Sequence, residues 1–171
     1  MNKGKENQRF DCDIFTDKEA IKLLKKAIKA KNQSNYPNIP EYAVPEPRYE
    51  DKTANGLTKC IVDFLNNTEG CQAERISSEG RVIDTRKTVT NTVGVIKTIG
   101  SIKRVKSSSQ VGTADISATM WGQSVKIEVK IGADRQSEAQ KLYQASIEKA
   151  GGIYLLIKSF GEFFNWYIHF K

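Results

Sequence analysis

Hydrophobic residues recur at helical spacing in three stretches of this chain, residues 18–31, 55–67 and 137–150. Such spacing predicts amphipathic helices, each with one face turned toward a core. We expect Asp17 to cap the first helix and Ser137 to begin the third, which ends at two consecutive glycines. The predicted inner stripe of the third helix consists of Ala139, Leu142, Tyr143, Ser146, Ile147 and Ala150.

Several other stretches have the composition of strands. Residues 71–77 predict a first strand, and residues 153–157 form a continuous apolar run that predicts a buried strand parallel to its neighbour. The segment 81–109 is rich in Val, Thr and Ile and is interrupted by Gly94 and Gly100, which indicates one β-hairpin or two. The end of the chain fits two patterns, a helical stripe from Phe160 to Tyr167 and a strand over residues 165–170, and both interpretations stay open.

Residues 111–120 and 125–131 predict two strands joined by the tight turn between them. A symmetric turn places Asp115 opposite Lys130. Glu128 then lies diagonally from Asp115, about 7–8 Å away between Cα atoms. Because side chains alternate along a strand, Glu128 and Lys130 share one face.

Two carboxylates and an ammonium are therefore predicted to lie together on a hairpin that is otherwise Ile and Val. A pair of like-charged carboxylates on an apolar sheet is unfavourable unless a cation or a shifted pKa relieves it. Asp115 and Glu128, with Lys130 beside them, predict a site for a hard divalent cation with oxygen ligands. A surface salt-bridge cluster is the alternative, and it fits poorly with the apolar residues that flank these charges.

These residues also carry a family resemblance. Asp115 followed by the Glu-Val-Lys sequence at 128–130 resembles the core of the PD-(D/E)XK nucleases. The Ser-Glu-Ala-Gln sequence at 137–140 and the Gly-Gly pair before the last apolar run are similar to the VRR-NUC branch, in the small form that phages carry. The resemblance extends over residues 55–170.

The resemblance implies an α/β fold with a mixed central sheet flanked by helices. It implies a nuclease that hydrolyses phosphodiester bonds in DNA and requires Mg²⁺ or Mn²⁺. Small relatives tend to form homodimers and some cleave branched DNA, so a second copy and branched or duplex DNA are the implied partners. A phage-encoded member would act in the cytosol of the bacterial host.

The resemblance also assigns roles to individual residues. Asp115, Glu128 and the main-chain carbonyl of Val129 would hold the metal ion, which polarises the scissile phosphate. Lys130 would orient the attacking water and offset charge that develops at phosphorus. Gln140 matches a glutamine that relatives keep near the active site. It also completes a Ser-x-x-Gln capping box, and the two interpretations are compatible.

One departure from the family supports a different hypothesis. Many such nucleases carry a glutamate on the first core helix as a further metal ligand, whereas this chain offers Asn55, Thr58 and Lys59 there. A single metal ion remains compatible with Asp115 and Glu128. The alternative is a nucleic-acid-binding or structural protein that kept the nuclease fold and lost cleavage.

The net charge of +7 favours a polyanionic partner. Basic residues concentrate in the segment 81–109, where a β-ribbon could contact phosphates without reading sequence. The alternative is that these lysines protect an exposed strand edge from aggregation. No base-reading motif is evident, so structure-selective action is expected. The expected nucleic-acid contacts are Arg75, Arg81, Arg86, Lys87, Lys97, Lys103, Arg104 and Lys106.

The expected domain organisation has two parts. Residues 1–52 combine a polar tail, a basic amphipathic helix and an arm that holds every proline, a segment that could dock a phage or replication protein. Residues 53–171 form the VRR-NUC-like domain, with 81–109 as its basic insertion. No stretch has the length of a membrane span, so no membrane partner is expected. Three cysteines without CxxC spacing indicate reduced thiols and a cytoplasmic location.

Overall fold

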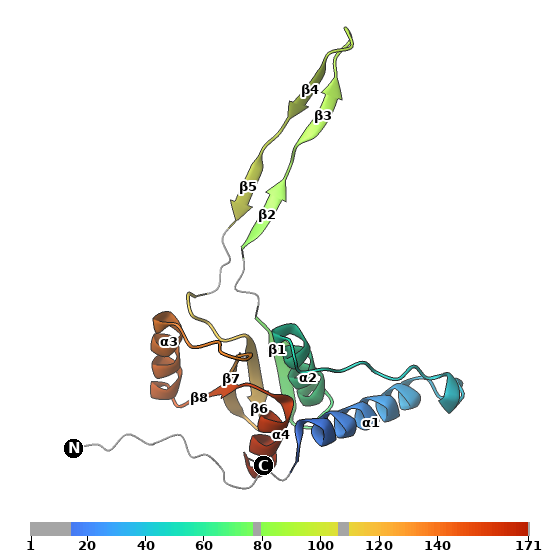
Figure 1. The fold of residues 1–171 in the computed structure, drawn as a ribbon, viewed down its shortest axis with the longest axis vertical. Helices are drawn as coiled ribbons and strands as arrows, with labels where there is room; N and C mark the ends of the chain where they lie inside the picture. The colour runs from blue at the N-terminus through green and yellow to red at the C-terminus, as the bar shows by residue number, and fades with distance from the viewer. Residues whose placement is uncertain (1–14, 77–79, 106–109, 171) are drawn as a thin grey trace, which may run out of the picture.

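The computed structural model describes residues 15–76, 80–105 and 110–170 of the chain. Its centre is a four-stranded mixed sheet in the order β1-β6-β7-β8 (Figure 1). The strands β1, β6 and β7 are antiparallel, and β8 is parallel to β7, which confirms the predicted parallel strand. The strand bounds are β1 Cys71–Arg75, β6 Ile116–Met120, β7 Gln123–Val129 and β8 Ile153–Ile157.

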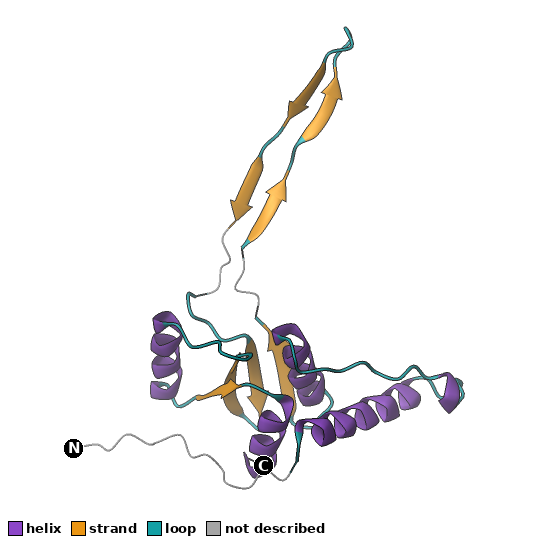
Figure 2. Cartoon of the chain, viewed as in Figure 1, coloured by secondary structure: helices purple, strands orange, loops and turns teal. Residues whose placement is uncertain are grey.

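Helices flank this sheet, so the predicted α/β architecture with a mixed central sheet is confirmed (Figure 2). The last segment is a helix throughout, which decides between the two patterns that the sequence left open. The helix bounds are α1 Asp17–Asn35, α2 Ala54–Asn66, α3 Glu138–Lys149 and α4 Phe160–Phe170, with a short 3₁₀ turn, η1, at Glu41–Ala43.

The two faces of the sheet differ in chemistry. The aliphatic face belongs to the hydrophobic core, where Leu57 and Ile61 of α2 and Phe160 and Phe163 of α4 are fully buried. The opposite face is polar and contains the candidate site. The aliphatic face is formed by Ala73, Ile116, Ala118, Met120, Val125, Ile127, Val129 and Ile157.

The first helix packs against the same core. Ala20 and Leu24 of α1 are 0% and 1% exposed and belong to the cluster formed by the sheet, α2 and α4. The predicted cap was wrong, because Thr16 is the N-cap and forms a capping box with Glu19. Asp17 instead accepts a hydrogen bond from the N–H of Gly161, at 3.0 Å, and so ties α1 to the start of α4.

The turn between β6 and β7 is centred one residue earlier in the chain than predicted. Trp121 and Gly122 have φ values of 45° and 81°, the geometry of a two-residue hairpin turn that follows strand twist. Met120 therefore pairs with Gln123, and the predicted register was wrong. Continuing the observed register places Asp115 opposite Glu128 rather than opposite Lys130.

The predicted β insertion is a single long ribbon that extends away from the sheet and helices (Figure 1). Its inner half pairs β2 (Arg81–Asp84) with β5 (Ile102–Val105), and its outer half pairs β3 (Lys87–Thr90) with β4 (Ile96–Ile99). Among the described residues, these strands pair only with one another. The hairpin prediction is therefore confirmed, and both edges of the ribbon are open.

Candidate active site

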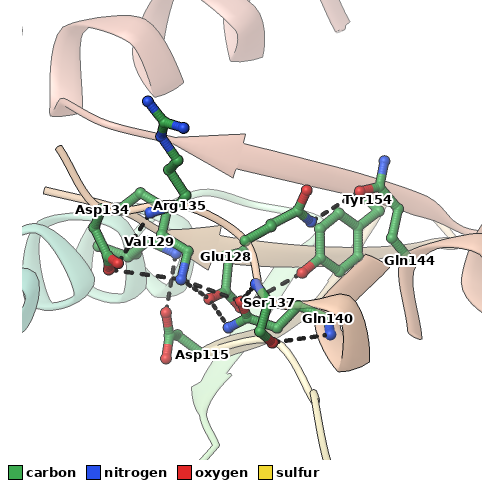
Figure 3. A network of polar contacts seen from close by, with 11 residues as sticks. Asp115, Glu128, Val129, Asp134, Arg135, Ser137, Gln140, Gln144 and Tyr154 are labelled. Carbon is green, nitrogen blue, oxygen red and sulfur yellow. Dashed lines mark hydrogen bonds and ion pairs between the residues drawn. The ribbon is translucent and has the colours of Figure 1, made fainter. Parts of the chain in front are cut away.

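A buried carboxylate lies at the centre of the polar face. The Glu128 residue of β7 is 2% exposed, and its Oε1 lies 3.0 Å from the Nζ of Lys130. The side-chain amide of Gln140 donates to the same oxygen, and the hydroxyl of Tyr154 lies 3.5 Å from Oε2. Figure 3 shows these side chains converging from β7, α3 and β8. Glu128 is therefore held by the ammonium of Lys130, which directly follows β7, the amide of Gln140 on α3 and the hydroxyl of Tyr154 on β8.

Asp115 lies at the start of β6, across from Glu128. Its Oδ2 accepts a hydrogen bond from the main-chain N–H of Val129 at 3.0 Å, and its own carbonyl accepts one from the N–H of Ile76 at 2.8 Å. The N–H and C=O of one strand residue point toward the same edge of the strand. The Val129 carbonyl therefore lies on the Asp115 side of β7, as a ligand set of Asp115, Glu128 and Val129 requires.

Lys130 is a buried cation with three acceptors around its ammonium group. It is 6% exposed, and its Nζ contacts Glu128, the Oε1 of Gln140 at 3.2 Å and Oδ2 of Asp134 at 3.6 Å. Burial alone would lower the pKa of Lys130, but the carboxylates of Glu128, Asp134 and Asp115 outweigh it and raise that pKa. The ammonium therefore stays charged at neutral pH.

The environment of Glu128 favours its neutral form, whereas the environment of Lys130 favours the charged form. Burial raises the pKa of its carboxyl group, Lys130 opposes that effect, and the charge of Asp115 adds to it. A second cation between Asp115 and Glu128 would relieve this repulsion, which is the condition that favours a divalent metal ion. The oxygen donors that a hard cation could use here are the carboxylates of Asp115 and Glu128 and the carbonyl of Val129, with waters for the remaining positions.

The helix α3 holds Gln140 over this site. Ser137 is the N-cap, and both halves of the predicted capping box with Gln140 are present. The same Oε1 of Gln140 accepts from the N–H of Ser137 at 2.9 Å and from Lys130. Capping and contact with the site are thus functions of one side chain.

The predicted inner stripe of α3 was wrong at Leu142, which is 74% exposed, and at Ser146 and Ala150, which are also exposed. The face turned inward carries the glutamines, since Gln140 bonds Glu128 and Gln144 accepts from Gln136 at 2.9 Å. These polar contacts, rather than apolar burial, set the rotation of the helix. The half-buried residues of this face are Ala139, Gln140, Tyr143, Gln144 and Ile147.

Three residues near the site were not among the sequence predictions. Tyr154 is 8% exposed, and burial together with the Glu128 charge raises the pKa of its hydroxyl, which therefore stays protonated. Asp134 contacts Lys130, and Lys126 donates to the hydroxyl of Ser117 one row away on the same face. A hydroxyl inside an otherwise aliphatic strand was the available signal for Tyr154.

The predicted nucleic-acid contacts do not lie at this site. Arg75 lies on the aliphatic side, where it donates to Oδ1 of Asn55 at 2.7 Å. Asn55, one of the three α2 residues on the face where the resemblance predicts an acid, is thus engaged with Arg75. The predicted basic residues within 81–105 all lie on the ribbon, and Lys106 falls outside the described residues.

Over the part of the chain that the structure describes, no group of three or more His, Cys, Asp or Glu residues is arranged to hold a metal ion. Any metal ion at this site would therefore depend on two carboxylates with main-chain and water oxygens. No helix in the described ranges is long and apolar enough to cross a membrane. Comparisons with protein-family models, with curated proteins and with solved structures found no match to this chain.

Proposed function

We propose that this chain is a divalent-metal-dependent nuclease with a PD-(D/E)XK-type core that hydrolyses phosphodiester bonds in DNA. One observation carries the proposal: a buried carboxylate, Glu128, lies across from Asp115 and is flanked by the charged Lys130. Burying these charges costs desolvation free energy, and replacing a buried ion pair with apolar residues is often neutral or stabilising, so stability alone does not account for the cluster.

The chain's own residues would divide the chemistry in the following way. Asp115, Glu128 and the Val129 carbonyl would hold Mg²⁺ or Mn²⁺, which polarises the phosphate and lowers the pKa of a bound water. Lys130, kept protonated by its neighbours, would offset the charge that develops on the phosphoryl oxygens. Gln140 would fix the carboxylate of Glu128 and the ammonium of Lys130 at the same time.

The test is cleavage of labelled single-stranded, duplex, flapped and four-way DNA with Mg²⁺, Mn²⁺ or EDTA. We expect metal-dependent cleavage that Glu128→Gln and Lys130→Ala reduce by about a hundredfold or more. Glu138→Gln is the matched control, because Glu138 is an exposed acid on α3 that pairs with Lys141. Equal cleavage by wild type and Glu128→Gln, or cleavage that persists in EDTA, would contradict the proposal.

A second candidate is a nucleic-acid-binding protein that has lost cleavage. The observation that favours it is the face of α2 where a further acidic ligand is expected, which carries Asn55, Thr58 and Lys59 instead, with Asn55 bonded to Arg75. This candidate predicts salt-sensitive DNA binding without cleavage of any substrate on the panel. It also predicts that Glu128→Gln changes neither property.

A further inference from the structure

The ribbon of residues 81–105 is a projecting element that lacks a covering partner among the described residues (Figure 1). Its two halves keep one register, since Arg81 pairs with Val105 in the inner half and Thr90 with Ile96 in the outer half. At about 3.3 Å per residue, each side of the ribbon is about 30 Å long. An isolated two-stranded hairpin is only marginally stable in water, so a surface that completes this ribbon is expected.

Exposed aliphatic side chains follow the ribbon and concentrate at its tip. Val93 is 82% exposed, Ile96 is 70% exposed and Val95 is 57% exposed. Asn91 holds the tip in one conformation, because its Oδ1 accepts from the N–H groups of Val93 and Val95 at 3.1 and 2.8 Å. The other exposed aliphatic residues are Val82, Val89, Ile99, Ile102 and Val105.

The charge of the ribbon has a single sign apart from one residue. Asp84 is the one acid in the sequence from 81 to 105, and the guanidinium of Arg86 contacts both of its carboxylate oxygens. This contact holds the pKa of Asp84 below its ordinary value and neutralises its charge. The basic residues that remain are Arg81, Lys87, Lys97, Lys103 and Arg104.

The pairing register arranges these charges in a regular way. On one face of each half, every basic side chain lies directly across from an aliphatic one, because opposed residues share a face. The cation lies on the first strand in one pair and on the second strand in the next, so positive charge reaches both long edges of the ribbon. The pairs are Arg81–Val105, Lys103–Ile83, Lys87–Ile99 and Lys97–Val89.

We propose that this ribbon lies in the major groove of double-stranded DNA. That groove has a phosphate row on each side and base edges with thymine methyl groups between them, and it is wide enough for a two-stranded ribbon. The long basic side chains of both strands can reach the phosphates on either side, and the shorter aliphatic side chains that alternate with them can meet the base edges between. The deep, narrow major groove of duplex RNA does not admit such a ribbon. This inference rests on the proposed function in taking DNA as the partner.

The first experiment locates the groove. Binding of the full chain to a fluorescent DNA duplex is measured by anisotropy in EDTA, so that cleavage does not interfere. We expect methyl green, which occupies the major groove, to displace the protein, and netropsin, which occupies the minor groove, to leave it bound. Displacement by netropsin alone, or equal affinity for duplex RNA, overturns the inference.

The second experiment identifies the residues that bind phosphate. Lys87→Ala, Lys97→Ala and Lys103→Ala together should lower the slope of log affinity against log salt by about 2.7, or about 0.9 for each phosphate that the protein no longer neutralises. The control removes the same charge from α1, through Lys18→Ala, Lys22→Ala and Lys26→Ala, which are exposed, and should leave the slope unchanged. An unchanged slope in the ribbon variant overturns the inference.

The aliphatic tip has its own test. Val93→Ser, Val95→Ser and Ile96→Thr together should weaken duplex binding about tenfold, since apolar area is no longer buried on the bases, without changing the salt slope. Sedimentation of the same variant tests whether a second copy covers the ribbon instead. Loss of a dimer with unchanged DNA affinity would show that the occupant is another copy and would overturn the inference.

The outcomes for the ribbon and for the proposed function are separable. Duplex binding through the ribbon, without cleavage under any metal condition, supports the inference and removes the nuclease. Metal-dependent cleavage by a protein whose ribbon variants bind duplex as tightly as wild type keeps the nuclease and overturns the inference. Absence of any duplex binding also overturns it.

Discussion

At the scale of single residues, the hydrogen bonding of Lys130 constrains how it can act. Its ammonium has three N–H donors, and three acceptors surround it, of which Asp134 is the most distant at 3.6 Å. Asp134 is also the exposed member, with 61% of its side chain accessible. A substrate phosphate that reaches Lys130 would therefore displace the carboxylate of Asp134.

Asp134→Asn should consequently increase cleavage. The substitution removes a negative charge that competes with phosphate for Lys130. Because the Asp134 side chain is 61% exposed, we take the range for exposed ion pairs, about 0.2–1 kcal/mol, which corresponds to about a 1.5- to fivefold rise in kcat/KM. Steady-state kinetics on the best DNA substrate measures the change. Glu138→Gln removes one charge from a nearby exposed position and should have no such effect. A fall in kcat/KM for Asp134→Asn would show that Asp134 assists the reaction.

A second prediction at this scale concerns Cys60, which is fully buried on α2. Burial raises the pKa of its thiol to about 12 from an ordinary value of 9.0. The native chain should therefore protect Cys60 from maleimide at pH 8, where almost no thiolate is present. Mass spectrometry after a labelling pulse, with and without denaturant, measures this protection.

The sign of the pH effect follows from the same shift. Because folding raises this pKa, the stability contributed by the neutral thiol is complete below pH 9 and is lost as the pH rises toward 12. Stability at pH 8 should therefore exceed stability at pH 10.5, as chemical denaturation can show. Rapid labelling of Cys60 in the native chain at pH 8 would contradict the burial on which this prediction depends.

The sequence located the central residues of the candidate site because their spacing on one hairpin is a local property. Glu128 and Lys130 share a face in any strand, and the capping box at Ser137 places Gln140 in the first turn of its helix. Tyr154 was not predicted, because its contact with Glu128 depends on how β8 aligns with β7 after a helical crossover. That alignment is a tertiary property, and the local signal, a hydroxyl inside an otherwise aliphatic strand, does not show which residue Tyr154 contacts.

At the scale of elements, α3 shows how one residue combines a structural and a site contact. Ser137→Ala removes the cap and should destabilise the protein by about 1 kcal/mol, whereas Ser137→Gly should cost only a few tenths. Both should retain cleavage, because Gln140 still bonds Glu128 and Lys130. Gln140→Met, which preserves helix propensity, should reduce cleavage about tenfold or more.

Thermal unfolding by circular dichroism and cleavage assays on the same samples separate these effects. If Gln140→Met lost stability and kept full cleavage, the glutamine would be a capping residue alone. If Ser137→Ala lost cleavage in proportion to Gln140→Met, the position of the whole helix, rather than the Gln140 amide, would control the site.

The β6–β7 hairpin shows where element-level prediction fails. The sequence predicted both strands, but the predicted turn was centred one residue later than the observed one, which moved the predicted partner of Asp115 from Glu128 to Lys130. Trp121 takes a positive φ that bulky residues rarely adopt, so the pattern did not indicate Trp121 as a central residue of the turn. Packing accounts for this backbone conformation, since the centroid of the Trp121 ring lies 5.6 Å from that of Tyr167 and 6.0 Å from that of Phe170.

At the scale of the whole molecule, the N-terminal helix is joined to the end of the chain. The side chain of Asn165 on α4 accepts from the N–H of Phe15 at 3.0 Å and donates to its carbonyl at 2.8 Å. Leu24 is 1% exposed within the core that α2, α4 and the sheet share. Sequence patterns did not indicate this contact, because it joins residues that are 150 positions apart in the chain.

Leu24→Ala should therefore destabilise the whole protein by about 2–5 kcal/mol, because apolar burial is reduced and a cavity is left behind. Leu23 provides a matched control on the same helix, since it is 41% exposed, and Leu23→Ala should cost less than about 1 kcal/mol. Urea unfolding followed by tryptophan fluorescence and by far-ultraviolet circular dichroism measures both. Trp121 and Trp166 report on the sheet and α4, outside the helix that is mutated.

The two probes also decide whether α1 unfolds with the core. If residues 15–35 belong to one cooperative unit with the sheet, the fluorescence and dichroism transitions of Leu24→Ala will coincide and shift together to lower urea. A separate early loss of helical signal, with the tryptophan transition unchanged, would mean that α1 docks on a core that is stable without it. That result would support the predicted boundary after residue 52 and make deletion of the N-terminal segment a clean test of its partners.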